Sequence, residues 1–186
     1  MLAANKPEGR PPRATLSPLQ VSLFSHAVAQ YIHAQRDKYY EQGKRLTLDD
    51  TWSRYFPAID LKRVRILEPG RERVDNPPFY ADLEQLGFVN LPNFTSMGAI
   101  TFDDVVVFHE PLEPPLVFHE LVHVTQYRLL GIEEFARLYV RGYLHGGYEG
   151  TPLEMCAYQL GERFVVGGPG FDVEAEVKAW IAAKRL

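Results

Sequence analysis

The strongest constraint in this chain is an apolar run at residues 115–131 that contains two histidines and a glutamate. The run predicts a helix, because Pro115 suits a first helical turn and Gly131 suits the left-handed position just after a helix end. His119 and His123 are four residues apart, so on a helix they lie on one face, about 6 Å apart along the axis. At that spacing both imidazoles can bind the same metal ion.

Glu120 has a different place in this pattern. It is rotated by about 100° from His119 around the helix axis, near the ion but poorly placed to be a third ligand beside both histidines. A zinc hydrolase needs this geometry, with two imidazoles on the metal and a carboxylate within reach of the water that the metal activates. Glu120 is therefore a candidate general base and not a candidate ligand.

The histidine pair can also arise without any metal. The five-residue pattern occurs by chance in roughly one such chain per hundred, and two histidines on a buried helix face can be ordinary core residues. The apolar neighbours, however, predict an uninterrupted buried helix, and buried histidines need polar partners, which a metal ion supplies. We interpret the pair as a metal site.

The sequence HELVH at residues 119–123 has the form H-E-x-x-H and resembles the motif of the zincin metallopeptidases. Catalytic zinc usually takes three protein ligands. The zincin class with a third histidine is excluded, because Gln126 and Leu129 stand where H-E-x-x-H-x-x-G-x-x-H has its glycine and last histidine. The other large class, the gluzincins, takes a glutamate from a downstream helix packed against the first.

Glu154 is the glutamate that this resemblance implies as the third ligand. It lies early in a predicted helix, after a connection long enough to bring the chain back to His123. Thr151 and Glu154 also have the spacing of a capping box, in which the glutamate would bind the backbone of the cap and no metal. Two rivals remain in the glycine-rich loop before this helix: His145, which would give a three-histidine site, and Glu149.

The resemblance covers roughly residues 99–164 and has implications for the fold. It implies an α+β, zincin-like protein, mostly helical, with a small sheet whose edge lies beside the active-site helix. It also implies a peptide or protein substrate, held as an added strand along residues 99–108.

The implied function is the zinc-dependent hydrolysis of peptide bonds. Glu120 would take a proton from the water at the zinc and pass it to the leaving amine. The oxyanion needs a second electrophile, and Tyr148 and His145 are the candidates because a mobile loop could bring them over the ion. Tyr143 and Tyr158 are expected in the core instead. The implied ligands of Zn²⁺ are His119, His123 and Glu154.

A competing interpretation is a non-catalytic or latent zinc-binding module with a structural or partner-binding role. In such a module a fourth protein ligand such as His145 would close the coordination site. A third interpretation is a metal-free helical domain whose motif is accidental. The peptidase interpretation is preferred because a purely structural site has no use for Glu120, whereas hydrolysis requires it.

Composition and charge restrict the class of protein. A chain of 186 residues with 46% hydrophobic and 24% charged residues suits one globular domain. We expect that domain at residues 17–186, after a flexible arm at residues 1–16 that is rich in proline and charge. The net charge of −4 and the lack of a basic stripe argue against nucleic-acid binding. The sequence carries no signal for an oligomeric state.

The sequence also favours a particular compartment. No apolar run approaches the ~20 residues needed to cross a membrane, and the N-terminus lacks the apolar centre of a secretory signal. The single cysteine, Cys156, excludes an intramolecular disulfide and fits a reducing compartment. We therefore expect a cytoplasmic protein, with Cys156 packed in the core and not acting as a nucleophile.

Local patterns predict the other elements. A capping box at residues 17–20 starts a helix that runs to about residue 42. A half-buried strand is expected at residues 61–67, and either two short strands about an Asp103-Asp104 turn or one bulged strand at residues 99–108. Further helices are expected at residues 47–56, 132–143, 151–164 and 172–184.

Two smaller expectations concern the surroundings of the motif. His109 and Glu110 follow the predicted strand and could line the cleft or simply cap a loop. Ala157 and Gly161 share a helix face with Glu154, and they keep it small where one helix must approach another closely.

Overall fold

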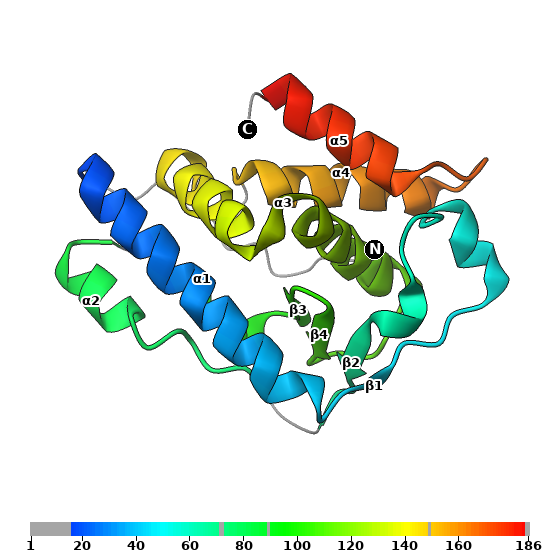
Figure 1. Ribbon diagram of the computed structural model, residues 1–186, viewed down its shortest axis with the longest axis horizontal. Helices are drawn as coiled ribbons and strands as arrows, with labels where there is room; N and C mark the ends of the chain where they lie inside the picture. The colour runs from blue at the N-terminus through cyan, green and yellow to red at the C-terminus, as the bar shows by residue number, and fades with distance from the viewer. Residues whose placement is uncertain (1–15, 71–72, 89, 149, 185–186) are drawn as a thin grey trace.

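The computed structural model describes residues 16–70, 73–88, 90–148 and 150–184. The predicted arm at residues 1–16 lies, apart from Leu16, outside them. The fold is mixed α+β, mostly helical with a small four-stranded sheet (Figure 1), which confirms the predicted fold class at that level.

The α-helices are α1 (Pro18–Tyr40), α2 (Tyr80–Gln85), α3 (Pro114–Gly146), α4 (Pro152–Val166) and α5 (Val173–Lys184). The strands are β1 (Lys44–Arg45), β2 (Arg65–Leu67), β3 (Ala99–Phe102) and β4 (Val105–Phe108), and the short 3₁₀ helices are η1 (Asp50–Arg54), η2 (Leu61–Arg63) and η3 (Phe94–Ser96).

The sheet has the strand order β1-β2-β4-β3, so β3 is an edge strand. β3 and β4 are antiparallel and are joined by a tight turn at Asp103 and Asp104, which confirms the two-strand interpretation of residues 99–108. Asp103 takes a positive φ of 58° there, a conformation that aspartate tolerates better than most residues. β2 runs parallel to β4, and β1 pairs antiparallel with β2. Of the strand predicted at residues 61–67, only β2 is paired, because η2 occupies the first part.

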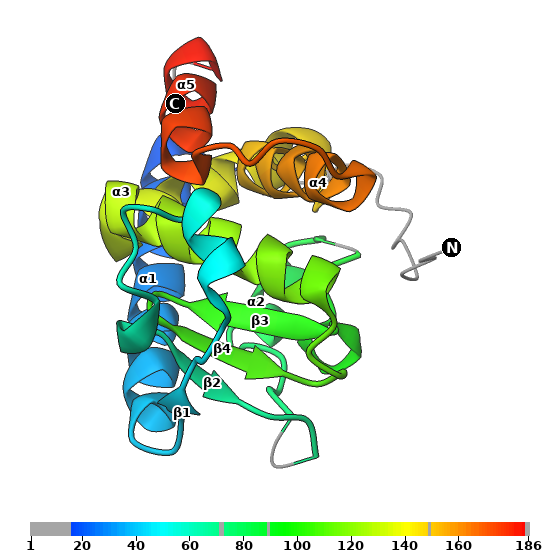
Figure 2. The same ribbon diagram turned by 90° about the vertical axis from the view of Figure 1, so that its right-hand side faces the viewer.

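The helix α1 lies on one face of the sheet, and α3 runs beside its β3 edge (Figure 2). Val105 and Val107 of β4 belong to a core shared with α1 and the second half of α3. Val106 and Phe108 belong to a second core, shared with the first half of α3, α4 and α5. This alternation is the two-residue period of a strand. All four side chains are almost fully buried, which explains why this apolar run shows no polar face.

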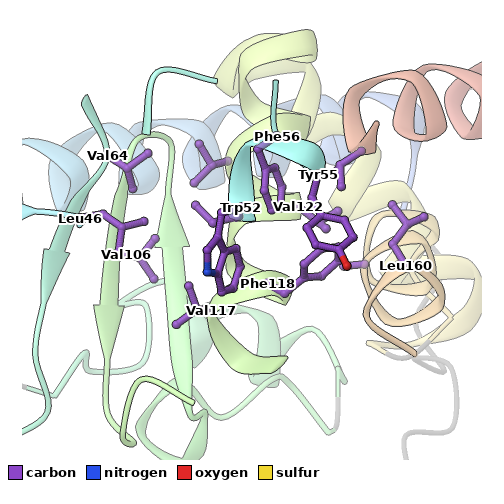
Figure 3. Packing of buried hydrophobic residues seen from close by; sticks show 14 of the residues in the cluster. Leu46, Trp52, Tyr55, Phe56, Val64, Val106, Val117, Phe118, Val122 and Leu160 are labelled. Carbon is purple, nitrogen blue, oxygen red and sulfur yellow. The ribbon is translucent and has the colours of Figure 1, made fainter. Parts of the chain in front are cut away.

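The core around the first half of α3 is aromatic (Figure 3). Phe118, the residue before His119, is fully buried and stacks on Phe164 of α4 with ring centroids 4.4 Å apart. Trp52 of η1 and Tyr55 just after it pack against the same ring. Large rings packed in this way fix the rotation of a helix. They therefore determine which face of α3 is turned toward α4, and with it the direction of His119.

The helix α3 is bent at Gly131, which has φ 74° and ψ 164°. This conformation is accessible essentially to glycine alone. The helix end predicted at Gly131 is thus a sharp bend between two helical halves. The bend changes the direction of the helix axis between the two halves of α3, and α4 then runs back and packs against α3 (Figure 1).

A second glycine sets the approach of α4 to α3. A Cβ atom at Gly142 would lie 2.6 Å from Pro152 Cδ and 3.1 Å from Thr151 Cα, so a larger residue would displace the start of α4. The expectation that Gly161 permits the close approach is wrong, because a Cβ there would meet nothing within 4 Å. Ala157, by contrast, is fully buried.

Two observations bear on the predicted compartment and on the cysteine. Among the helices described here, none combines the length and the apolar character that crossing a membrane would require. Cys156 is buried in the core, as predicted, and its burial raises the pKa of the thiol to about 11. The thiol is therefore protonated near neutral pH and is a poor nucleophile.

We expect Gly131→Ala to lower the free energy of unfolding by about 1–3 kcal/mol, because alanine is strained in this conformation even though space is open around its Cβ. The matched control is Gly161→Ala, which also enters open space but sits in regular helix. It should raise the free energy of unfolding by about 0.5–1 kcal/mol. Urea denaturation of both variants measures the difference, and effects of the same sign would contradict the assigned bend.

Candidate metal centre

The three residues implied as ligands converge on one point. His119 Nε2 lies 3.1 Å from His123 Nε2, and Glu154 Oε2 lies 3.5 Å from each of the two nitrogens. The histidines come from the first half of α3, and Glu154 comes from the first turn of α4. The three atoms form a nearly equilateral triangle of two imidazole nitrogens and one carboxylate oxygen, a group able to hold a metal ion.

The size of this triangle fits a metal ion. Around a tetrahedral zinc ion with ligands at about 2.0–2.1 Å, neighbouring ligand atoms are about 3.3 Å apart. The separations of 3.1, 3.5 and 3.5 Å lie on both sides of that value. A hydrogen bond alone could bring the two histidines together, but it would not place a carboxylate oxygen equally far from both.

Glu154 gives an independent reason for a cation at this place. Its carboxylate is buried, and within the described part of the chain no group donates a hydrogen bond to Oε2. The 3.5 Å contacts to the histidines are too long to be good hydrogen bonds. Burying a carboxylate oxygen that accepts no good hydrogen bond is costly. A divalent cation between Glu154 and the two imidazoles would satisfy it, so the residues present fit a metal.

The electrostatics of the metal-free cluster point the same way. Burial alone would lower the pKa of His123, but the neighbouring Glu154 carboxylate outweighs it and raises the pKa of His123 to about 9. Burial would likewise raise the pKa of Glu154, yet His123 and His119 hold that pKa well below its usual range. In the metal-free protein a proton on the imidazoles therefore balances the carboxylate. A metal ion binding at neutral pH displaces that proton.

The alternative role of Glu154 in a capping box is wrong. Thr151 is the residue before α4, but its side chain makes no capping hydrogen bond to the start of the helix. Thr151 Oγ1 donates to the carbonyl oxygen of Gly147 at 3.1 Å instead. The Glu154 side chain is directed across to α3.

Gln126 holds the ring of His123 from the side away from the cluster. Gln126 Nε2 donates to the carbonyl of Leu153 at 2.9 Å, so Gln126 Oε1 faces His123 Nδ1, also at 2.9 Å. An amide oxygen can only accept, so Nδ1 carries a proton, and in the neutral ring Nε2 presents its lone pair to the cluster. Because Leu153 directly precedes Glu154, one amide group links the two ligand-bearing helices.

Glu120 lies beside the cluster and is not one of the converging ligands, in keeping with its predicted rotation. Its carboxylate is buried, and Oε2 accepts a hydrogen bond of 2.6 Å from Thr101 Oγ1 on the edge strand β3. This contact joins the sheet edge to α3. Sequence reasoning did not find Thr101, because a threonine in a strand carries no motif.

Of the predicted loop residues that the structure describes, His145 and Tyr148, only Tyr148 lies at the cluster. Tyr148 lines a cavity with the two histidines, and burial together with the Glu154 carboxylate raises its pKa well above the usual value, so the phenol keeps its proton. His145 is exposed, and its Nδ1 lies 2.7 Å from the Arg141 carbonyl. The chain is still helical there, because α3 continues to residue 146, and His145 is not placed as a ligand or an oxyanion donor. Glu149 lies outside the described residues.

Tyr158 has a different place from the one expected. It is 44% exposed, and its ring centroid lies 4.8 Å from that of His119, so assigning it to the core is wrong. It follows Glu154 by one helical turn on α4, and that spacing could have identified it as a neighbour of the cluster. Tyr143, the other tyrosine expected in the core, is buried.

His109 belongs to a loop and not to the metal centre. Its Nε2 accepts a hydrogen bond from the Val74 backbone N–H at 3.0 Å, so Nδ1 carries the proton that is donated to the Met97 carbonyl at 2.8 Å. Burial lowers the pKa of His109, which keeps the ring neutral. Of the two roles open from the sequence, the structure supports the loop-fixing one.

The cluster adjoins a cavity of about 110 Å³. Its walls come from α1, from residues 77–97, from β3 and from α3, and most of them are apolar or aromatic. No lysine or arginine occurs among the described residues that line it. The apolar walls include Phe24, Val28, Ile32, Phe79, Leu91, Phe94, Met97, Ile100, Phe102, Phe135 and Val140.

Comparison of the chain with models of known families, with curated proteins and with solved structures gives no match.

We expect Glu154→Ala to reduce bound metal from about one ion per chain to near zero, because it removes one of three ligands. His145→Ala is the control, since it removes an exposed imidazole outside the cluster, and Glu149→Ala tests the remaining rival. Plasma mass spectrometry of the purified variants measures the stoichiometry. Retention of metal by Glu154→Ala, or its loss in either of the other two variants, would overturn the ligand set.

Gln126→Leu should weaken metal binding by about 10–100-fold without abolishing it, because the ring of His123 loses the group that orients it. Thr125→Val is the matched control: Thr125 is also buried on α3, but its hydroxyl bonds only the Leu121 carbonyl of the same helix. Competition with a chromogenic chelator gives both affinities. Equal affinities of the two variants would show that Gln126 has no orienting role.

Proposed function

We propose that this chain is a zinc-dependent metallopeptidase of zincin-like architecture, with Zn²⁺ held by His119, His123 and Glu154. The observation that carries the proposal is the position of Glu120, a buried carboxylate that lies beside the three ligands without being one of them. A structural metal site has no need of such a group. The edge strand β3 beside the metal-binding helix also supports this architecture.

Each residue of the site then has a defined task. Bound zinc would act as a Lewis acid that lowers the pKa of a water molecule and polarises the scissile carbonyl. Glu120 takes the proton of the attacking water and passes it to the leaving amine. Since Oε2 of Glu120 accepts the hydrogen bond from Thr101, the proton is transferred through Oε1 of Glu120. Tyr148, which burial keeps protonated, donates to the developing oxyanion from the cavity wall.

The substrate has two places where it could be held, and the contacts favour one of them. A peptide added as a strand would need the outer edge of β3. There, the Thr101 carbonyl already accepts a hydrogen bond from the Tyr127 hydroxyl at 3.4 Å, in a buried position. A peptide strand would have to displace this contact, so we assign the larger share of substrate binding to the cavity.

The second candidate is a non-catalytic or latent zinc-binding module. The burial of the cluster favours it: the side chains of His119, His123 and Glu154 are only 15%, 8% and 6% exposed. In that role the ion would serve to hold α4 against α3. The two candidates differ in whether Glu120 has a function.

Glu120→Gln distinguishes them. If Glu120 is the general base, peptide hydrolysis by the zinc-loaded protein falls by about 10²–10⁴-fold, while zinc stoichiometry stays at about one. Glu162→Gln, an exposed change of the same kind on α4, should leave both unchanged. Mass spectrometry of a mixed peptide pool measures cleavage. Full activity in Glu120→Gln would refute the general-base role, and a zinc-loaded wild type that cuts nothing would favour the non-catalytic module.

A further inference from the structure

We propose that the cavity beside the metal cluster binds one uncharged, branched aliphatic side chain of the substrate, of leucine size. The peptide bond next to that residue then lies at the metal. This inference rests on the proposed function only in taking the ligand to be part of a peptide, because binding of the side chain does not require hydrolysis.

The volume of the cavity limits the size of its occupant. It measures about 110 Å³, whereas an apolar cavity of about 150 Å³ in another protein accommodates one benzene molecule. A leucine or isoleucine side chain therefore fits, and a phenylalanine ring is at the upper limit. The cavity has no room for an extended chain of several residues, so it selects one side chain.

The chemistry of the walls limits the charge of the occupant. Among the described residues that line the cavity, the two histidines and the carboxylates of Glu120 and Glu154 all lie at the cluster end. Away from that end the walls are hydrocarbon and phenol, and burial raises the pKa values of Tyr31 and Tyr80, so both stay neutral. A charged side chain would lose its hydration there without gaining a partner.

The same walls argue for an internal peptide bond. A carboxypeptidase must recognise the terminal carboxylate of its substrate, which is the task of a lysine or an arginine. No such residue occurs among the described residues that line the cavity. Without such a partner a terminal carboxylate would lose its hydration in the cavity uncompensated, so the occupant belongs to an internal residue of the peptide.

The pocket is formed before any ligand enters. Tyr31 of α1 packs edge-on against Phe79 and Phe102, with ring centroids 5.8 and 6.1 Å apart. Its hydroxyl donates to the Asp75 carbonyl at 3.1 Å. These contacts tie α1, the segment before α2 and β3 together around one space. When a ligand binds to a preformed apolar pocket, little conformational entropy is lost in ordering the walls, so the affinity is higher.

The test is to titrate N-acetyl amino-acid amides into the protein and to monitor binding in ¹H–¹⁵N correlation spectra. Both the metal-free and the zinc-loaded protein are titrated. The leucine derivative should shift amides of α1 and β3, and the glycine, lysine and glutamate derivatives should bind about 10–100-fold more weakly. Lysine or glutamate binding as tightly as leucine would overturn the proposal.

Two substitutions on the cavity wall sharpen the test. Val28→Phe fills the cavity and should abolish leucine binding, whereas Val28→Ala enlarges it and should shift the preference toward the phenylalanine derivative. Val165→Phe is the matched control, because Val165 is 60% exposed on α4 and lies outside the cavity. The dispersion of the ¹H–¹⁵N spectrum of each variant confirms that it is folded, whether or not zinc is bound. Leucine binding that survives Val28→Phe in a folded protein would place the ligand elsewhere.

The outcomes for the cavity and for the proposed function are separable. If leucine binds selectively and the zinc-loaded protein cuts no peptide, the cavity assignment stands and the peptidase proposal fails. If peptides are cut with no preference for leucine or isoleucine beside the bond, the peptidase proposal stands and the cavity assignment fails.

Discussion

A carboxylate buried between two helices has to be balanced by a positive charge, and in this protein Glu154 imposes that condition where α4 meets α3. The effective cost of an uncompensated buried ion is several kcal/mol, comparable to the whole stability of a small domain. In the metal-free protein a proton on the imidazoles supplies this positive charge. The Glu154 carboxylate favours that proton and so raises the pKa of His123. The proposed metal ion would meet it better, because it would bind all three atoms at once. Under this proposal, helix packing and metal binding depend on the same three side chains.

The surrounding structure holds each reactive group from outside the cluster. Gln126 orients His123 and is itself fixed by the backbone of α4. Thr101 reaches across from the sheet to hold Glu120. Phe118, next to His119, is stacked on an aromatic ring of α4. The proposed ligands and the proposed general base are thus held by contacts from different elements, and small rotations of α3 are opposed from more than one side. Such support is what a site needs if its geometry is to match a transition state.

The part of this site that could be predicted from the sequence is the part encoded by local spacing. Helical periodicity placed His119 and His123 together and set Glu120 apart from them, while Gly131 marked the point where the helix changes direction. Gln126 follows His123 by three residues and so shares its helix face, although the hydrogen bond that fixes it depends on a carbonyl of another helix. These residues are separated by only one or two helical turns, so their relative positions can be predicted without knowing which distant segments pack together.

The remaining features depend on contacts between distant parts of the chain. The hydrogen bond from Thr101 to Glu120 arises only after a strand docks beside a helix. The two-residue strand β1 exists only because β2 pairs with it. His145 was misplaced because its glycine-rich neighbourhood predicts a loop, whereas packing of the second half of α3 extends the helix to residue 146. The cavity could not be predicted from the sequence, because its walls come from several separate segments and no local hydrophobic period predicts where they meet.

The location of the ligands in the chain has a consequence for how such a protein can change. The three proposed ligands and Glu120 all lie within residues 119–154, on α3 and α4, whereas much of the apolar wall opposite them comes from residues 24–32 and 77–102. Substitutions in the first hundred residues can therefore reshape the pocket while leaving the coordination geometry intact. Under the proposed function, selectivity can therefore change through the N-terminal part of the wall alone, even though Phe135 and Val140 of α3 also line the pocket.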